Sequence, residues 1–113
     1  MKHETYNIPL YFGELHVFIS NDFAKVNEKY KLKLDVFYHH GFDAVTGSFH
    51  KKSGFTRYFV IMRKKVFLKC IVHESKHLVD RIFQDRNIHA DFSNDEPECY
   101  LLGWIFESIK KVL

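Results

Sequence analysis

Three residues in the segment CIVHESKHLVDRIF (70–83) have the types and the spacing that metal chemistry requires. His73 and His77 are four positions apart, so on a helix both imidazoles lie one turn apart on one side, where they can bind the same ion. Glu74 lies beside them but off their axis, where it can take a proton from metal-bound water rather than bind the metal. The segment therefore predicts a metal site with a general base, provided that it folds as a helix.

The apolar residues around the histidines predict that helix. They repeat at i, i+7/8 and i+11 and form one stripe, which consists of Ile71, Val72, Leu78, Val79, Ile82 and Phe83. His73, His77 and Asp80 lie on a different face, with Cys70 close beside them. A second element that crosses this polar face would bury it.

The final segment, NDEPECYLLGWIFESIKKVL (94–113), is the candidate for that second element. Asn94 or Asp95 can cap a helix here, and Pro97 is tolerated in its first turn. Its core face is apolar and consists of Leu101, Leu102, Ile105, Ile109 and Val112. Another face carries Glu96, Cys99, Tyr100 and Gly103, and its two small residues would let a neighbouring helix come close. We expect this helix to close the metal site and to bury Cys70 and Cys99 at the helix crossing.

The first two thirds of the chain predict a small sheet and one short helix. Residues 8–20 are rich in β-branched and aromatic residues, which predicts a strand, broken near Gly13. Asn21 or Asp22 can cap a helix over 22–31, and 35–50 reads as one interrupted strand or two short ones. The turn at 51–54 makes 55–64 its hairpin partner. The fold class is α+β, one domain over 1–113: a small, mostly antiparallel sheet, an early helix, the helix with the histidines and a C-terminal helix.

Composition narrows the class of partner and the compartment. The net charge of +3 is mild and spread out, so we expect no nucleic-acid partner. No apolar run approaches the ~18–20 residues of a membrane span, so we expect no membrane partner either. The N-terminus lacks the order of a secretory signal, and two cysteines without one fit a reducing compartment. A cytoplasmic location is therefore expected.

A catalytic zinc ion takes three protein ligands and one open position. One zincin class places a third histidine six residues after the second and reaches it through a glycine, but those positions hold Phe83 and Asp80. In the gluzincin class the third ligand is a glutamate on a following helix, within the pattern acid, Glu, two residues, small residue. The segment 95–99, DEPEC, fits that pattern nineteen positions after His77.

The pair HESKH and NDEPECYLLGWI resembles the minimal gluzincins, which are short zincin-like metallopeptidase domains. It is most similar to small HExxH proteins carried by tailed phages, and more distantly to the ImmA/IrrE-like and SprT-like peptidases. The resemblance is specific over 70–106 and topological before that. It implies that His73, His77 and Glu96 bind Zn²⁺, that Glu74 is the general base, and that the substrate is a peptide or protein. For a phage protein the cytosol is that of the host, or the protein is associated with the virion.

Several assignments stay open. Glu98 competes with Glu96 as third ligand, although it sits at a capping-box position and points with the core face. Asp80 can brace a ligand histidine or pair with Lys76 on the surface. Tyr100 and the pair His39–His40 are candidates for stabilising a tetrahedral oxyanion. An extended peptide is expected to add as a strand to the 54–63 hairpin region. The alternative to an enzyme is a catalytically silent, zinc-stabilised binding or virion-associated module, because after the predicted helices only 110–113 remain to wall a cleft.

Overall fold

Four strands form one mixed sheet in the computed structural model, which describes residues 1–34, 42–52 and 55–113. The strands are β1 (Lys2–Asn7), β2 (Glu14–Ile19), β3 (Ala44–Lys52) and β4 (Phe55–Met62), in the order β1-β2-β4-β3. β1 and β3 each run antiparallel to their neighbour, whereas β2 and β4 are parallel. Two of the three pairings are antiparallel, so the predicted, mostly antiparallel sheet is confirmed, and β3 is one of its edges.

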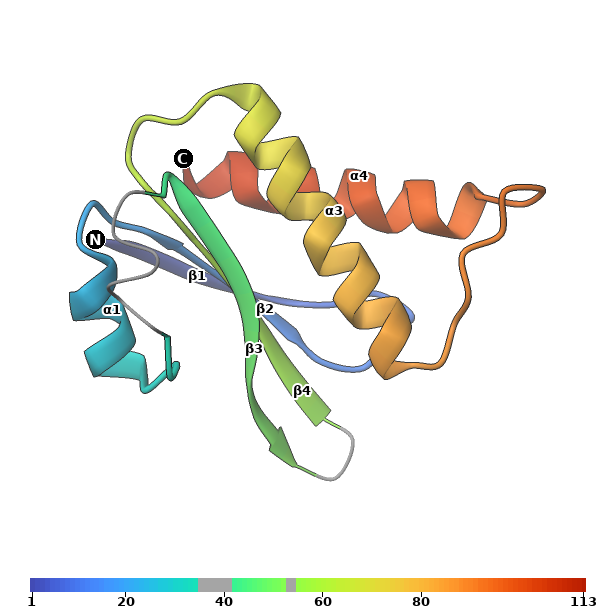
Figure 1. Cartoon of the computed structure of the whole chain (residues 1–113), viewed down its shortest axis with the longest axis horizontal. Coiled ribbons are helices and arrows are strands. Elements are labelled where there is room, and N and C mark those ends of the chain that lie inside the picture. Colours follow the sequence, from blue (N-terminus) through green and yellow to red (C-terminus); the bar gives the residue numbers. More distant parts are fainter. Residues whose placement is uncertain (35–41, 53–54) are drawn as a thin grey trace.

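Within the described residues, three helices cover the two faces of this sheet (Figure 1). α1 (Phe23–Tyr30) lies on one face, and α3 (Leu68–Asp85) and α4 (Glu96–Val112) lie on the other. Asp22 caps α1 as expected, because its carboxylate accepts the Lys25 backbone N–H at 3.1 Å. The predicted α+β class, with an early helix, the histidine helix and a C-terminal helix, is confirmed. None of the helices in the described part of the chain is long and apolar enough to cross a membrane.

The two central strands are buried on both faces, which divides the core into two layers. Side chains of β2 and β4 that face α3 and α4 include Val17, Tyr58 and Val60, and those that face α1 include Phe18 and Phe59. All five are at most 1% exposed. A strand buried on both faces needs a continuous apolar run rather than an alternating one, which accounts for the sequence YFVIM in β4.

The chain before β2 differs from the prediction. Residues 2–7 form an edge strand that the apolar pattern of the sequence does not predict, because its side chains are mostly exposed. The strand expected over 8–20 is confined to Glu14–Ile19, because a turn precedes it in which Ile8 N–H donates to Gly13 O at 3.1 Å. Gly13 adopts φ +130°, a backbone conformation that L side chains rarely take, so the break expected near this glycine is confirmed.

α4 packs differently from the prediction. Its face toward the sheet and α3 is formed by Leu101, Ile105 and Ile109, as expected. Its small-residue face, however, meets no helix: a Cβ placed on Gly103 would have no heavy atom within 4 Å, and Cys99 is exposed. The prediction of a close helix crossing with two buried cysteines is therefore wrong for Cys99, and Cys70 is only partly buried. The reason is that α4 turns its apolar stripe to the sheet, which leaves the small residues toward solvent.

Candidate metal centre

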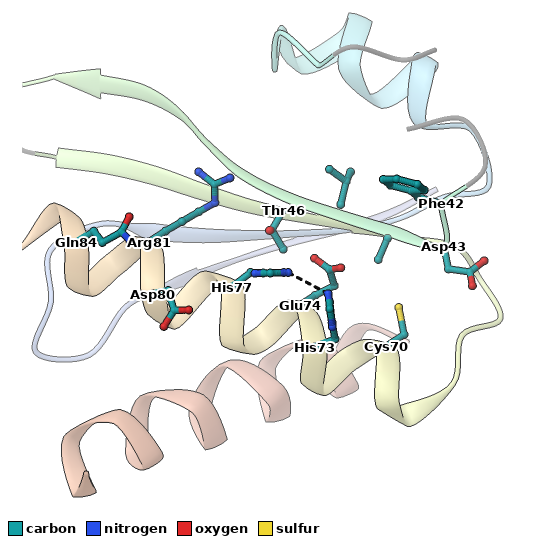
Figure 2. A pocket seen from close by; sticks show the side chains of 12 residues that line it. Phe42, Asp43, Thr46, Cys70, His73, Glu74, His77, Asp80, Arg81 and Gln84 are labelled. Atoms are coloured by element: carbon teal, nitrogen blue, oxygen red, sulfur yellow. Dashed lines mark hydrogen bonds between the residues drawn. The ribbon is translucent and has the colours of Figure 1, made fainter. Parts of the chain in front are cut away.

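α3 brings His73, Glu74 and His77 together on the side that faces β3 (Figure 2). One ligand atom from each residue lies within 4.8 Å of the others. The Nε2 atoms of His73 and His77 are 3.0 Å apart, with the two rings nearly perpendicular at 84°. Two nitrogen atoms that each lie about 2.05 Å from one tetrahedral ion are about 3.3 Å apart. The two imidazoles therefore need to move only slightly to bind one ion, and the predicted pairing of the histidines is met by the fold.

Glu74 is the buried member of the group. Its side chain reaches toward β3, where the Thr46 hydroxyl hydrogen-bonds to the carboxylate, and the residue is only 9% exposed. Burial raises the pKa of Glu74 above its ordinary value, while the two neighbouring histidines and the Thr46 hydroxyl act in the opposite direction. A carboxylate that is buried and has a raised pKa accepts a proton more readily than an exposed one. The same position also lets it contribute an oxygen ligand to the ion.

A groove of about 820 Å³ runs between α3 and the start of β3 and contains this group. Thr46 and Asp43 lie on the β3 side, and His73, His77 and Arg81 lie on the α3 side (Figure 2). Because β3 is an edge strand, its outer edge is where an extended segment can add. The strand addition expected at 54–63 is wrong, since β4 is central and is paired on both sides. The edge available beside the histidines belongs to β3.

Lys76 forms ion pairs with Asp80, the candidate brace of a ligand histidine, and with Glu98, the alternative third ligand. Its Nζ donates to Asp80 Oδ1 at 2.5 Å and to Glu98 Oε1 at 2.6 Å, which ties α3 to the first turn of α4. Of the two roles considered for Asp80, the ion pair with Lys76 is the one that the structure contains. Both carboxylates raise the pKa of Lys76, so the ammonium stays charged and holds both acids.

Glu96 lies elsewhere. It lines a different, apolar hollow together with Pro9, Leu10 and Tyr100, at the beginning of α4. In the described part of the chain the group with metal-binding spacing contains His73, Glu74 and His77 and does not include Glu96. The structure thus brings the two histidines together with the predicted base but does not bring the predicted third ligand to them. The assignment of Glu96 to zinc stays a prediction.

Of the candidates for an oxyanion group, the structure describes Tyr100, which does not line the groove with the histidines. Tyr100 is 76% exposed and lines the same apolar hollow as Glu96, and His39–His40 lie outside the described residues. Arg81 is not among the residues predicted from the sequence, yet it lines the groove and its charge acts on Glu74. Arg81 lies four residues after His77, so helical spacing alone could have predicted that it lies near the histidines. Thr46 lies on a strand far away in the sequence, and no local pattern predicts its contact with Glu74.

Cys70 lines the groove near the N-terminal end of α3 (Figure 2). Burial, together with the charges of Glu74 and Asp43, raises the pKa of the Cys70 thiol. In the described part of the chain, the group with metal-binding spacing does not include Cys70.

No protein-family model matches the sequence, and comparisons with curated proteins and with solved structures found no match. Of the residues that carry the resemblance, the structure brings together those of the HExxH group on α3. That group can hold a metal ion, and its chemistry has to be inferred from its own geometry.

Proposed function

We propose that this chain is a zinc-dependent metallopeptidase of the gluzincin type, with His73 and His77 as zinc ligands and Glu74 as the general base. One observation carries the proposal: two imidazole nitrogens 3.0 Å apart lie next to a buried carboxylate, inside a groove that opens beside an edge strand. Structural metal sites need neither the buried base nor the strand edge. A metal-dependent peptide hydrolase uses a general base, and an edge strand can hold an extended peptide beside it.

Each residue of the group has a defined part in the proposed reaction. Zinc, when bound, lowers the pKa of its water and polarises a carbonyl oxygen. Glu74 accepts a proton from the attacking water and returns it to the leaving amine, and the Thr46 hydroxyl keeps its carboxylate oriented. An extended peptide along β3 would place its carbonyl over His73 and His77. Glu96 is the proposed third ligand, which requires its side chain to leave the hollow that it lines and to reach toward His73 and His77.

Metal content tests the ligand assignment. We expect near-stoichiometric zinc by elemental analysis in the wild type and in His89→Ala, a control that removes an exposed histidine from the loop before α4. His73→Ala and His77→Ala should each lose most of it, because two ligands from the protein hold zinc far more weakly than three. Loss in Glu96→Ala but not in Glu98→Ala supports Glu96; the reverse result would replace Glu96 by Glu98.

Hydrolysis tests the catalytic assignment. Glu74→Gln keeps the size of the side chain but cannot accept the proton, so we expect bound zinc and a loss of peptide hydrolysis of roughly 10²–10⁴-fold. The matched control is Glu107→Gln, an exposed glutamate on α4. A quenched-fluorescence peptide library measures the rate. Full activity in Glu74→Gln would reject the mechanism.

A second candidate is a catalytically silent module in which the metal stabilises a binding surface. It is favoured by one observation: a carboxylate oxygen of Glu74 lies within 4.8 Å of a ring nitrogen of each histidine, so all three residues could bind one ion. If Glu74 occupies a coordination position, it cannot also act as a base. This candidate predicts that Glu74→Gln loses zinc and that the zinc-loaded wild type hydrolyses no peptide, a pair of results opposite to those expected for the enzyme.

A further inference from the structure

A second cluster of ionisable side chains lies on the opposite face of the sheet, beside the end of α1. It surrounds a hollow of about 640 Å³, to which all four strands contribute, and the polar residues of its wall are Thr5, Glu14, His16, Lys29, Lys31 and Arg57. The aromatic side chains of Tyr30 and Phe49 complete the wall. Nothing in the proposed peptidase uses this hollow, because the sheet separates it from α3.

Strand register explains how the polar residues meet. β1 pairs with β2 so that Thr5 is opposite His16 and His3 is opposite Phe18. Residues 3 and 16 are therefore diagonal neighbours on one face of the sheet. The His3 ring stacks on Phe18 with 4.2 Å between ring centroids, which holds it beside His16.

A chain of hydrogen bonds orders the cluster. Tyr30 Oη and His3 Nδ1 are 3.2 Å apart, His3 Nε2 and His16 Nδ1 are 3.0 Å apart, and His16 Nε2 and Glu14 Oε1 are 3.3 Å apart. With both histidines neutral, one assignment satisfies every contact: Tyr30 donates to His3, His3 donates to His16, and His16 donates to Glu14. Arg57 Nε donates to the same Glu14 oxygen at 3.0 Å. The hollow is thus preorganised, and its carboxylate is engaged by two donors.

The residues that line the hollow carry more positive than negative charge. Lys29, Lys31 and Arg57 are basic, and Glu14 is the one acid among the residues that line the hollow. Neither lysine forms an ion pair within the described part of the chain. The groove on the other face has the opposite balance, with the carboxylates Asp43, Glu74 and Asp80 against Arg81. A concave surface with a surplus of one sign concentrates ligands of the other sign.

We propose that this hollow binds the phosphate group of a small phosphorylated ligand. An arginine and two lysines around one concavity match the charge of a phosphate monoester, and a guanidinium suits its planar pairs of oxygens. The volume is that of a small-molecule site. Tyr30 and Phe49 offer apolar surface to the remainder of the ligand, for which a ring is the best match. A nucleic acid would need basic residues that continue along a track, whereas these converge on one hollow.

Calorimetric titration of the full chain with inorganic phosphate and with phenyl phosphate at low salt tests the proposal. We expect Lys29→Gln and Lys31→Gln each to weaken binding about threefold and Arg57→Gln to weaken it more, because each removes one positive charge from the wall. Lys111→Gln, an exposed lysine at the end of α4, is the matched control and should have no effect. Circular dichroism checks that every variant is folded.

Glu14→Gln gives a prediction of opposite sign. It removes the acid of the hollow while its amide oxygen can still accept from Arg57 and His16, so phosphate should bind several-fold more tightly. A purely structural role for Glu14 would predict no change or weaker binding. This variant also answers the concern that Arg57→Gln could act by disturbing the fold.

Comparison of the two titrants shows whether the ligand is inorganic phosphate or an organic phosphate. Tighter binding of phenyl phosphate than of inorganic phosphate supports an organic ligand whose ring contacts the aromatic wall; equal binding supports inorganic phosphate itself. No binding of either by the wild type at about 10 mM, well above a millimolar Kd, overturns the proposal. So does equal weakening in Lys111→Gln, or binding of an oligonucleotide alone with a steep dependence on salt.

Discussion

Gly103→Ala tests the arrangement of α4 on which the identity of the third ligand depends. The sequence predicts a helix crossing at the face that carries Glu96, Cys99 and Gly103, whereas in the structure a Cβ on Gly103 meets nothing within 4 Å. Alanine in the interior of an exposed helix is about 0.5–1 kcal/mol more favourable than glycine, because glycine loses more backbone entropy. For a chain of 113 residues we therefore expect Tm to rise by about 3 °C.

Thermal unfolding followed by circular dichroism at a helix band measures this change, and a denaturant titration checks the free energy of unfolding. Gly47→Ala is the matched comparison in β3, because its Cβ would lie 2.6 Å from Cζ of Phe59, a ring that is 1% exposed. Overpacking of this kind costs about 1–3 kcal/mol, so Gly47→Ala should lower Tm. A fall in Tm for Gly103→Ala as well would refute the reasoning. It would mean that another element covers this face of α4, as it would have to if Glu96 approached the histidines.

Three further changes have expected outcomes. Burial raises the pKa of Glu74, so the metal-free protein should lose stability as pH rises above the ordinary value of 4.5; Glu74→Gln should unfold at the same temperature as wild type below that pH and at a higher one at neutral pH. Tyr58 Oη donates to Asp85 Oδ2 at 2.7 Å, so Tyr58→Phe should lower the free energy of unfolding by roughly 1–3 kcal/mol in urea titrations, and an unchanged midpoint would contradict this contact. Asp22→Ala removes the cap on Lys25 N–H and should cost about 1 kcal/mol by the same assay, with faster amide exchange confined to α1; uniform exchange across the chain would count against a local role.

Much of the fold was predictable because its signals are local. The apolar stripe with Leu78 and Ile82 predicted α3, and the cap at Asp22 predicted α1. β1 was missed because a short edge strand with exposed side chains has no apolar pattern to detect. Val72 was assigned to the buried stripe of α3 but is 47% exposed, since a helix wheel cannot tell how wide the covering sheet is.

The candidate site divides in the same way. His73, Glu74 and His77 share one turn of one helix, so helical geometry alone brings them together. Thr46 lies on β3 and reaches Glu74 only because that strand is the edge over which α3 packs. The prediction that a peptide adds at 54–63 was wrong because strand order, which makes β4 central and β3 an edge, is not a local property of the sequence.

The sequence by itself determined a helix with two histidines and a glutamate that can hold a metal ion, because the period of an α-helix converts a spacing of four residues into proximity. Only the tertiary structure decided what surrounds that group. The rotation of α4 about its axis follows from burial of its apolar stripe. This rotation places Glu96 in a separate hollow and lets Glu98 form an ion pair with Lys76. The register of β1 on β2, and the packing of α1, likewise brought His3, His16 and Tyr30 into one hydrogen-bonded chain. These placements depend on free energies summed over many long-range contacts, and no short stretch of sequence records them.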